Sequence, residues 1–170
     1  MKGPSILDKT GFHYGWAVLA VGTLAVFSAL GLGRFGYTMV LPAMQTDLGM
    51  NNAQAGLLAT FNLAGYLIFV IVGGALSTRY GTRLVVFVSL GFAGIGMIGT
   101  GLADHFLSVS VWRGLTGIAS GGGNIAVMGL LAAWFGSRKR GLASGIAVSG
   151  SSFALVFTGE FVPWISAVQG

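Results

Sequence analysis

The sequence contains no cysteine, and only 8% of its 170 residues are charged. The lack of cysteine excludes disulfide scaffolds, thiolate metal sites and thiol nucleophiles. Soluble domains carry about 25% charged residues, so this chain lacks the charge that an ordinary water-facing surface requires. It has just three prolines, and its thirty glycines follow no three-residue period, which excludes collagen. Because 54% of the residues are hydrophobic, the solvent that suits this chain is lipid.

Five apolar segments are long enough to cross a bilayer, which takes about 20 residues in a helix. We expect an all-α, polytopic membrane protein with spans at about 14–40, 54–76, 84–102, 106–134 and 142–162. A cytoplasmic segment, 1–13, would precede a membrane domain over 14–170. Lys2 and Lys9 ahead of an apolar run also occur in signal peptides, but this run is longer than a signal-peptide core and four more spans follow. A retained first helix is therefore expected.

The loop charges alternate along the chain. Seven cations lie before the first span and after the second and fourth, namely Lys2, Lys9, Arg79, Arg83, Arg138, Lys139 and Arg140. The loops after the first and third spans contain no lysine or arginine. Cation-rich loops face the cytoplasm. We therefore expect a protein of the bacterial cytoplasmic membrane with a cytoplasmic N-terminus. This topology explains the net charge of +5, so no nucleic-acid partner is expected.

Two stretches match the pattern G-x-G-x-x-G, beginning at Gly31 and Gly94. Both lie within predicted spans rather than between a strand and a helix, so they indicate close helix packing and not a dinucleotide site. Further packing faces are expected at Gly117 and Gly121, and at Gly141, Gly145 and Ser149.

An intramembrane serine protease is the enzyme class to weigh, because Ser149, Ser151 and Ser152 lie in the fifth span. A serine nucleophile needs a base within hydrogen-bond reach. The two histidines, His13 and His105, lie at opposite membrane edges. We predict no enzyme, no catalytic residue, no metal site and no cofactor.

Three charged residues lie inside predicted spans: Arg34, Arg113 and Glu160. A charge in a bilayer costs several kcal/mol unless it is paired or faces water, so each is a candidate functional residue. Arg34 and Glu160 could instead extend to the outer interface. Arg113 is expected either to pair with Glu160 or to face an aqueous cavity, with Asn62 and Asn124 as neutral partners.

The segment GGALSTRYGTRLVV resembles the signature loop of the major facilitator superfamily. Gly74, Arg79, Gly81 and Arg83 fit that loop, and Thr78 stands where the family has Asp. The resemblance implies a gating loop on the cytoplasmic side, after the second helix.

A second stretch, RGLTGIASG from Arg113, resembles the fourth-helix motif that the family associates with proton coupling. A third, GLGRFGYTMVLPAMQTDLGM, resembles a poorly characterised bacterial branch of the superfamily. The Gly-Pro pair of the antiporter motif in the fifth helix is absent.

The resemblance implies a segment of a secondary active transporter that moves a small solute by alternating access. Arg34 and Arg113 would favour an anionic substrate, or would hold Glu160 ionised until a proton arrives. Family members have about twelve helices in two halves, so a missing C-terminal half is an implied partner beside lipid, substrate and protons. The chain would be a fragment, a truncated gene or one half of a split protein. The alternative is a small non-transporting membrane subunit.

Overall fold

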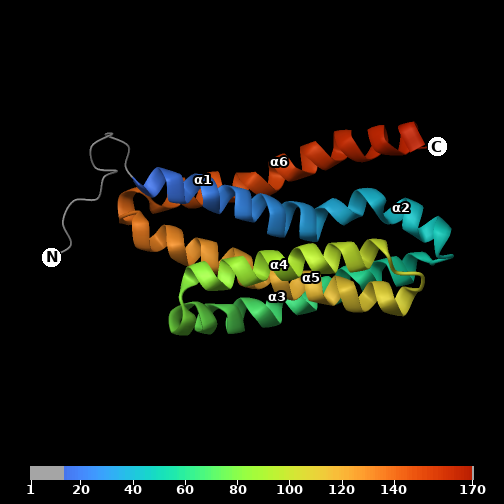
Figure 1. The fold of residues 1–170 in the computed structure, drawn as a ribbon, viewed down its shortest axis with the longest axis horizontal. Coiled ribbons are helices and arrows are strands. Elements are labelled where there is room, and N and C mark those ends of the chain that lie inside the picture. The colour runs from blue at the N-terminus through green and yellow to red at the C-terminus, as the bar shows by residue number, and fades with distance from the viewer. Residues whose placement is uncertain (1–13, 170) are drawn as a thin grey trace.

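The computed structural model describes residues 14–169, which form helices joined by short turns (Figure 1). The elements are α1 (Tyr14–Val26), the π-helix η2 (Phe27–Gly36), α2 (Tyr37–Asp47), α3 (Asn52–Tyr80), α4 (Thr82–Gly101), α5 (Phe106–Trp134) and α6 (Ser137–Gln169). The first three are continuous, so five helical stretches are long and apolar enough to cross a membrane. The expectation of an all-α, polytopic membrane protein is confirmed. The expected N-terminal segment 1–13 lies outside the described residues.

Several helices run beyond the apolar segments that hydropathy marks. The first continues through Pro42 to Asp47, whereas its apolar run ends near residue 40. The last begins at Ser137, where three consecutive cations already form its first turn. Hydropathy responds to apolar character alone, whereas a helix continues through polar residues at a membrane edge as long as its backbone hydrogen bonds form.

Two short turns show how local sequence fixes the helix ends. A single residue, Gly81, separates α3 from α4, and its φ of +90° is a conformation that favours glycine. Its N–H donates to the carbonyl of Ser77 at 3.1 Å. At the opposite end of the bundle, Asn51 and Gln54 form a reciprocal capping box at the start of α3. The helices therefore alternate in direction with little connecting chain.

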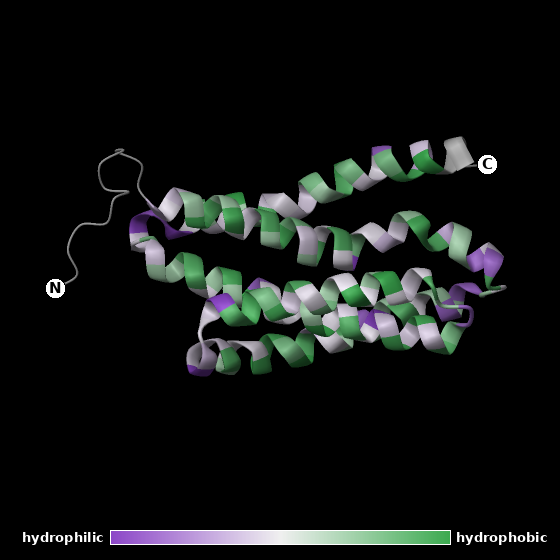
Figure 2. Ribbon diagram, in the orientation of Figure 1, coloured by the Kyte–Doolittle hydropathy of each residue, from purple (hydrophilic) through white to green (hydrophobic). Residues whose placement is uncertain are grey.

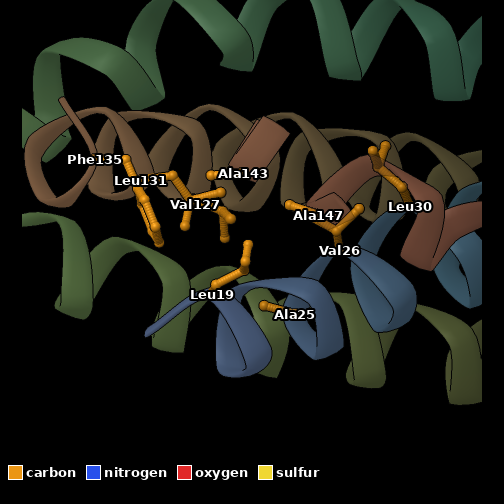
Figure 3. Packing of buried hydrophobic residues seen from close by; sticks show 9 residues of the cluster. All are labelled: Leu19, Ala25, Val26, Leu30, Val127, Leu131, Phe135, Ala143 and Ala147. Carbon is orange, nitrogen blue, oxygen red and sulfur yellow. The ribbon is translucent and has the colours of Figure 1, made fainter. Parts of the chain in front are cut away.

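The bundle has two groups of helices, with α1 beside α6 and with α3, α4 and α5 packed together (Figure 1). Nine buried apolar residues of α1, η2, α5 and α6 and the turn after α5 form a core between these groups (Figure 3): Leu19, Ala25, Val26, Leu30, Val127, Leu131, Phe135, Ala143 and Ala147. Hydrophilic residues gather at the two ends of the bundle, whereas its length is mostly hydrophobic (Figure 2). This distribution suits a lipid environment.

Glycines allow α3 and α5 to approach closely. A Cβ on Gly117 would overlap the carbonyl oxygen of Asn62, and one on Gly121 would lie 2.5 Å from that of Tyr66. The packing role predicted for these two glycines is confirmed. The interpretation of the Gly31 stretch as a packing face is also confirmed, because Gly31 contacts Ala154 of α6.

The small-residue ridge expected on the last span is wrong. Added Cβ atoms at Gly141 and Gly145 would meet no atom within 4 Å. The ridge that packs lies on the neighbouring face of α6 and comprises Ala143, Ala147, Gly150, Ala154 and Thr158. This face consists of small residues from Ala143 to Thr158, so α1 and η2 can pack against it along that length.

We predict that Asp104 and Ser137 lie on opposite sides of the membrane. Both are exposed; Asp104 lies in the turn between α4 and α5 and Ser137 begins α6, and these two places lie at opposite ends of the bundle (Figure 1). Single cysteines introduced by Asp104→Cys and Ser137→Cys can be labelled without background because the chain has no cysteine. In intact cells, an impermeant maleimide should label position 104, whereas position 137 should react only after permeabilisation. Equal labelling before permeabilisation would contradict this topology.

Candidate substrate and coupling site

Arg34 lies near the middle of the bundle. Because the first helix extends to Asp47, Arg34 is 13 residues, or about 20 Å, from that end. Its guanidinium carbon lies 4.1 Å from the centroid of the Tyr66 ring and 5.4 Å from that of Phe35. Arg34 therefore lies within the bundle rather than at its end.

Tyr66 joins Arg34 to the predicted residue Asn124. The Asn124 Nδ2 donates a hydrogen bond to the Tyr66 hydroxyl at 3.0 Å, while the Asn124 Oδ1 is buried without a partner. Arg34, Tyr66 and Asn124 come from η2, α3 and α5, and we call them the Arg34 cluster. Sequence reasoning missed Tyr66, whose one signal was a hydroxyl at the midpoint of an apolar span.

Arg113 is almost completely buried, with 1% of its surface exposed. Its Nη1 donates to the carbonyl of Gly33 at 3.0 Å and its Nη2 to the carbonyl of Arg34 at 3.2 Å. The guanidinium carbon also lies 3.6 Å from the centroid of the Tyr37 ring, while Nε has no hydrogen-bond partner. Arg113 therefore binds the backbone that carries Arg34.

The π-helix η2 receives three side-chain hydrogen bonds from α5. Besides the two from Arg113, the Ser120 hydroxyl donates to the carbonyl of Ala29 at 2.6 Å. Segments wound as π-helix are frequent at functional sites. Here, the π-helical winding of η2 and the hydrogen bonds from α5 together fix the direction in which the Arg34 side chain projects from its helix.

The structure does not bring Glu160 to Arg113. Glu160 has an exposed side chain on α6, and residues 14–165 contain no ion pair between these two side chains. In this conformation, the expected pairing is therefore not formed. The same part of the chain contains no group of three His, Asp or Glu residues that could hold a metal ion.

Asn62 supports Arg113 from the backbone side. Its Nδ2 donates to the carbonyl of Arg113 at 2.9 Å and to the Thr116 hydroxyl at 3.0 Å. These bonds tie α3 to α5 beside Gly117. Asn62 is therefore a structural neighbour of the site rather than a member of the Arg34 cluster.

The residues of the expected gating loop lie at one end of the bundle. Gly74 is helical, Thr78 is exposed, and its hydroxyl donates to the carbonyl of Ala75 at 2.8 Å within its own helix. Thr78 is twelve residues beyond Tyr66 on α3, about 18 Å along the axis.

The cations of that loop also stay at this end. Arg79 lies over the Tyr80 ring at 5.5 Å, Gly81 forms the turn, and Arg83 lines a cavity beside Trp134. The loop and the Arg34 cluster thus lie in separate regions of the bundle.

Comparison with known proteins identifies the family. The model of the Major Facilitator Superfamily matches residues 19–170. The hexuronate transporter of Bacillus subtilis is 29% identical over 135 residues, which cover 79% of this chain and 32% of the relative. The probable sulfoacetate transporter SauU of Cupriavidus necator is 27% identical over 153 residues, covering 90% and 35%. An uncharacterised MFS-type transporter of Mycobacterium tuberculosis is 30% identical over 139 residues, covering 82% and 31%.

This chain thus spans about a third of the length of these relatives. Their names do not single out the poorly characterised bacterial branch, which stays a prediction. From residue 19 onward, the family match covers the five membrane-length helices and the loop motif at the turn between α3 and α4. This multi-pass membrane protein belongs to the major facilitator superfamily.

Proposed function

We propose that this chain is the N-terminal segment of a secondary active transporter that moves a small anionic solute by alternating access. The observation that carries the proposal is the position of Arg34, a cation near the middle of the bundle with no ion pair among residues 14–165. An intramembrane charge is expensive unless it meets a partner or water, and such residues mark substrate and ion pathways. A transported anion would supply the missing partner.

The surroundings of Arg34 support an anionic substrate. The Tyr66 ring stabilises the guanidinium through its face, which leaves the hydrogen-bond donors of Arg34 free for a ligand. Guanidinium binds carboxylate and similar anions with two parallel hydrogen bonds. Two of the relatives are named as transporters of hexuronate and sulfoacetate, which are both anions.

The other predicted residues have supporting roles in this proposal. Asn124 orients the Tyr66 hydroxyl, and Arg113 fixes the backbone at Arg34, with Asn62 holding Arg113 in turn. Glu160 is the carboxylate that would carry a coupling proton, since it is exposed on α6 rather than paired.

The loop with Gly74, Thr78, Arg79, Gly81 and Arg83 would contribute to closing the cytoplasmic side. The Thr78 hydroxyl is already bonded within α3, so it would support closure more weakly than the Asp of the family. In this orientation, the N-terminus is cytoplasmic and the protein lies in the cytoplasmic membrane.

The test begins with the DNA that follows the sequence. We expect an in-frame or separately encoded continuation of about seven more spans, which together with these five would make about twelve. Purified whole protein in liposomes should accumulate organic anions such as galacturonate or sulfoacetate. The chain of residues 1–170 alone should not exceed empty liposomes, because the other wall of the pathway is missing.

Either of two results would contradict the proposal. One is a stop codon with no second half encoded nearby, which would favour a non-transporting subunit. The other is transport by the isolated chain at rates comparable to the whole protein.

A further inference from the structure

A cavity of about 250 Å³ lies between α3, α4 and α5. Phe69 of α3, Phe92 of α4 and Leu115 of α5 are among its lining residues. The lining is apolar apart from one side chain, that of Ser89. Asn124 follows Leu115 on α5 by nine residues, about 2.5 turns, so the two side chains point to opposite sides of the helix. The cavity is therefore separate from the Arg34 cluster.

The cavity is accessible from the lipid. Ser89 lies 7 residues after the first residue of α4 and 12 before the last, about 10 and 18 Å along the axis. This depth falls within the apolar length of the bundle. At the rim of the cavity, Val88 and Phe92 are 43% and 47% exposed. A molecule dissolved in the bilayer can therefore reach the cavity from the side.

The Ser89 hydroxyl gives the cavity its one polar side-chain group. Ser89 is 5% exposed, and its hydroxyl has no hydrogen-bond partner among residues 14–165. By contrast, the Thr100 hydroxyl on the same helix donates to the carbonyl of Gly96 at 2.7 Å. A Cβ on Gly122 would lie 2.8 Å from the Ser89 Oγ, so glycine at this position leaves room for the hydroxyl beside α5. Ser89 thus retains a donor and an acceptor for a ligand.

The size and chemistry of the walls identify the class of occupant. A buried water needs about two to four polar partners, and Ser89 supplies one. A lipid acyl chain suits the walls but leaves the hydroxyl unpaired, which is costly in a buried site. An apolar cavity of about 150 Å³ binds benzene, so this larger one has room for a substituted ring. Phe69 and Phe92 also favour an aromatic body, because aromatic rings stack on one another or meet edge to face.

We propose that the cavity between α3, α4 and α5 binds a small aromatic molecule with one hydroxyl group, of the class of phenols and aromatic alcohols, which enters from the lipid. The ring occupies the apolar space beside Phe69 and Phe92, and the hydroxyl of the ligand forms a hydrogen bond with that of Ser89. Binding at this cavity needs no transport, so the proposal stands or falls apart from the proposed function.

Photolabelling of the chain in liposomes tests the proposal. The probe is benzyl alcohol with a trifluoromethyl diazirine on its ring, and mass spectrometry locates its adducts. The competitors are benzyl alcohol and toluene, which differ by the hydroxyl alone, with their amounts expressed per lipid. We expect saturable adducts at the cavity residues Phe69, Phe92 and Leu115. Adducts at Ile71, an exposed residue of α3 outside the cavity, should not saturate.

Benzyl alcohol should suppress the cavity adducts at about a tenfold lower concentration in the lipid than toluene, equivalent to about 1.4 kcal/mol. In Ser89→Ala, which keeps the cavity and removes its hydroxyl, the two competitors should act alike. The matched control is Ser152→Ala, which removes an exposed hydroxyl from α6 and should keep the tenfold difference.

Filling the cavity should abolish the saturable adducts. Ala119→Leu enlarges a buried side chain of the lining. Ser89→Ala is a smaller change and tests the proposal even if Ala119→Leu does not fold. Cavity adducts that neither competitor suppresses, or that both suppress equally in the wild-type chain, would overturn the proposal. An unchanged tenfold preference in Ser89→Ala would overturn it as well.

Discussion

Arg34→Gln in the whole transporter should lower the initial rate of anion uptake at low substrate by about 100-fold or more. Removing one partner of a desolvated, charged hydrogen-bond pair costs about 2–5 kcal/mol, and each 1.4 kcal/mol is a factor of ten. Glutamine keeps a polar side chain near Tyr66 but removes the charge that the substrate would meet. The measurement is uptake into proteoliposomes over a range of substrate concentrations.

Two further variants separate the binding role of Arg34 from its charge alone. Arg34→Lys should restore only part of the uptake, because an ammonium lacks the planar fork and stacks poorly on an aromatic ring. Arg138→Gln removes one cation from an exposed position at the start of α6 and should leave uptake within about twofold, as expected of a surface site. Uptake at the wild-type rate by Arg34→Gln would remove the basis for an anion site.

Gly117→Ala should destabilise the chain strongly, by about 3 kcal/mol. Its new methyl group would overlap the carbonyl oxygen of Asn62, and backbone cannot move aside as a flexible side chain can. The same shift would strain the bonds from Asn62 to the Arg113 carbonyl and to Thr116. Thermal unfolding in detergent should show a Tm lower by roughly 6–12 °C.

Gly114→Ala is the matched control for this prediction. Gly114 lies one turn earlier on the same helix, and a Cβ there would meet no atom within 4 Å. Alanine is favoured over glycine in a helix by about 1 kcal/mol, so this variant should unfold at the same temperature or slightly higher. If both variants unfolded alike, the close approach of α3 and α5 would not be a determinant of stability.

The fold was largely predictable from the sequence because its signal is simple. Five apolar runs of membrane length correspond to five long helices, and the Arg79–Arg83 loop motif falls at the α3–α4 turn. The depth of Arg34 was not predictable in the same way. Hydropathy ended the first span at about residue 40, whereas the helix continues to Asp47 and thereby places Arg34 well inside the bundle.

The composition of the site depended on tertiary contacts that no local pattern reveals. Tyr66 and Tyr37 each stack on an arginine from another helix, and neither was a candidate. Arg113 was expected to meet a carboxylate or a cavity, yet its donors reach the carbonyls of Gly33 and Arg34. Backbone acceptors carry no signature in the sequence, so a buried arginine satisfied in this way cannot be distinguished beforehand from one that needs an acid.

The contact between Gly31 and Ala154 has a consequence for biosynthesis. The first helix packs against a helix whose partner residue is synthesised about 120 residues later. At translation rates of about 5–20 residues per second, Gly31 waits roughly 6–25 s for that surface to leave the ribosome. Tyr66 and Arg113 follow Arg34 in the chain by 32 and 79 residues, so Arg34 enters the membrane before either of them. The first helix therefore depends on the insertion machinery, or on neighbouring lipid headgroups, to shelter its charge until the later helices arrive.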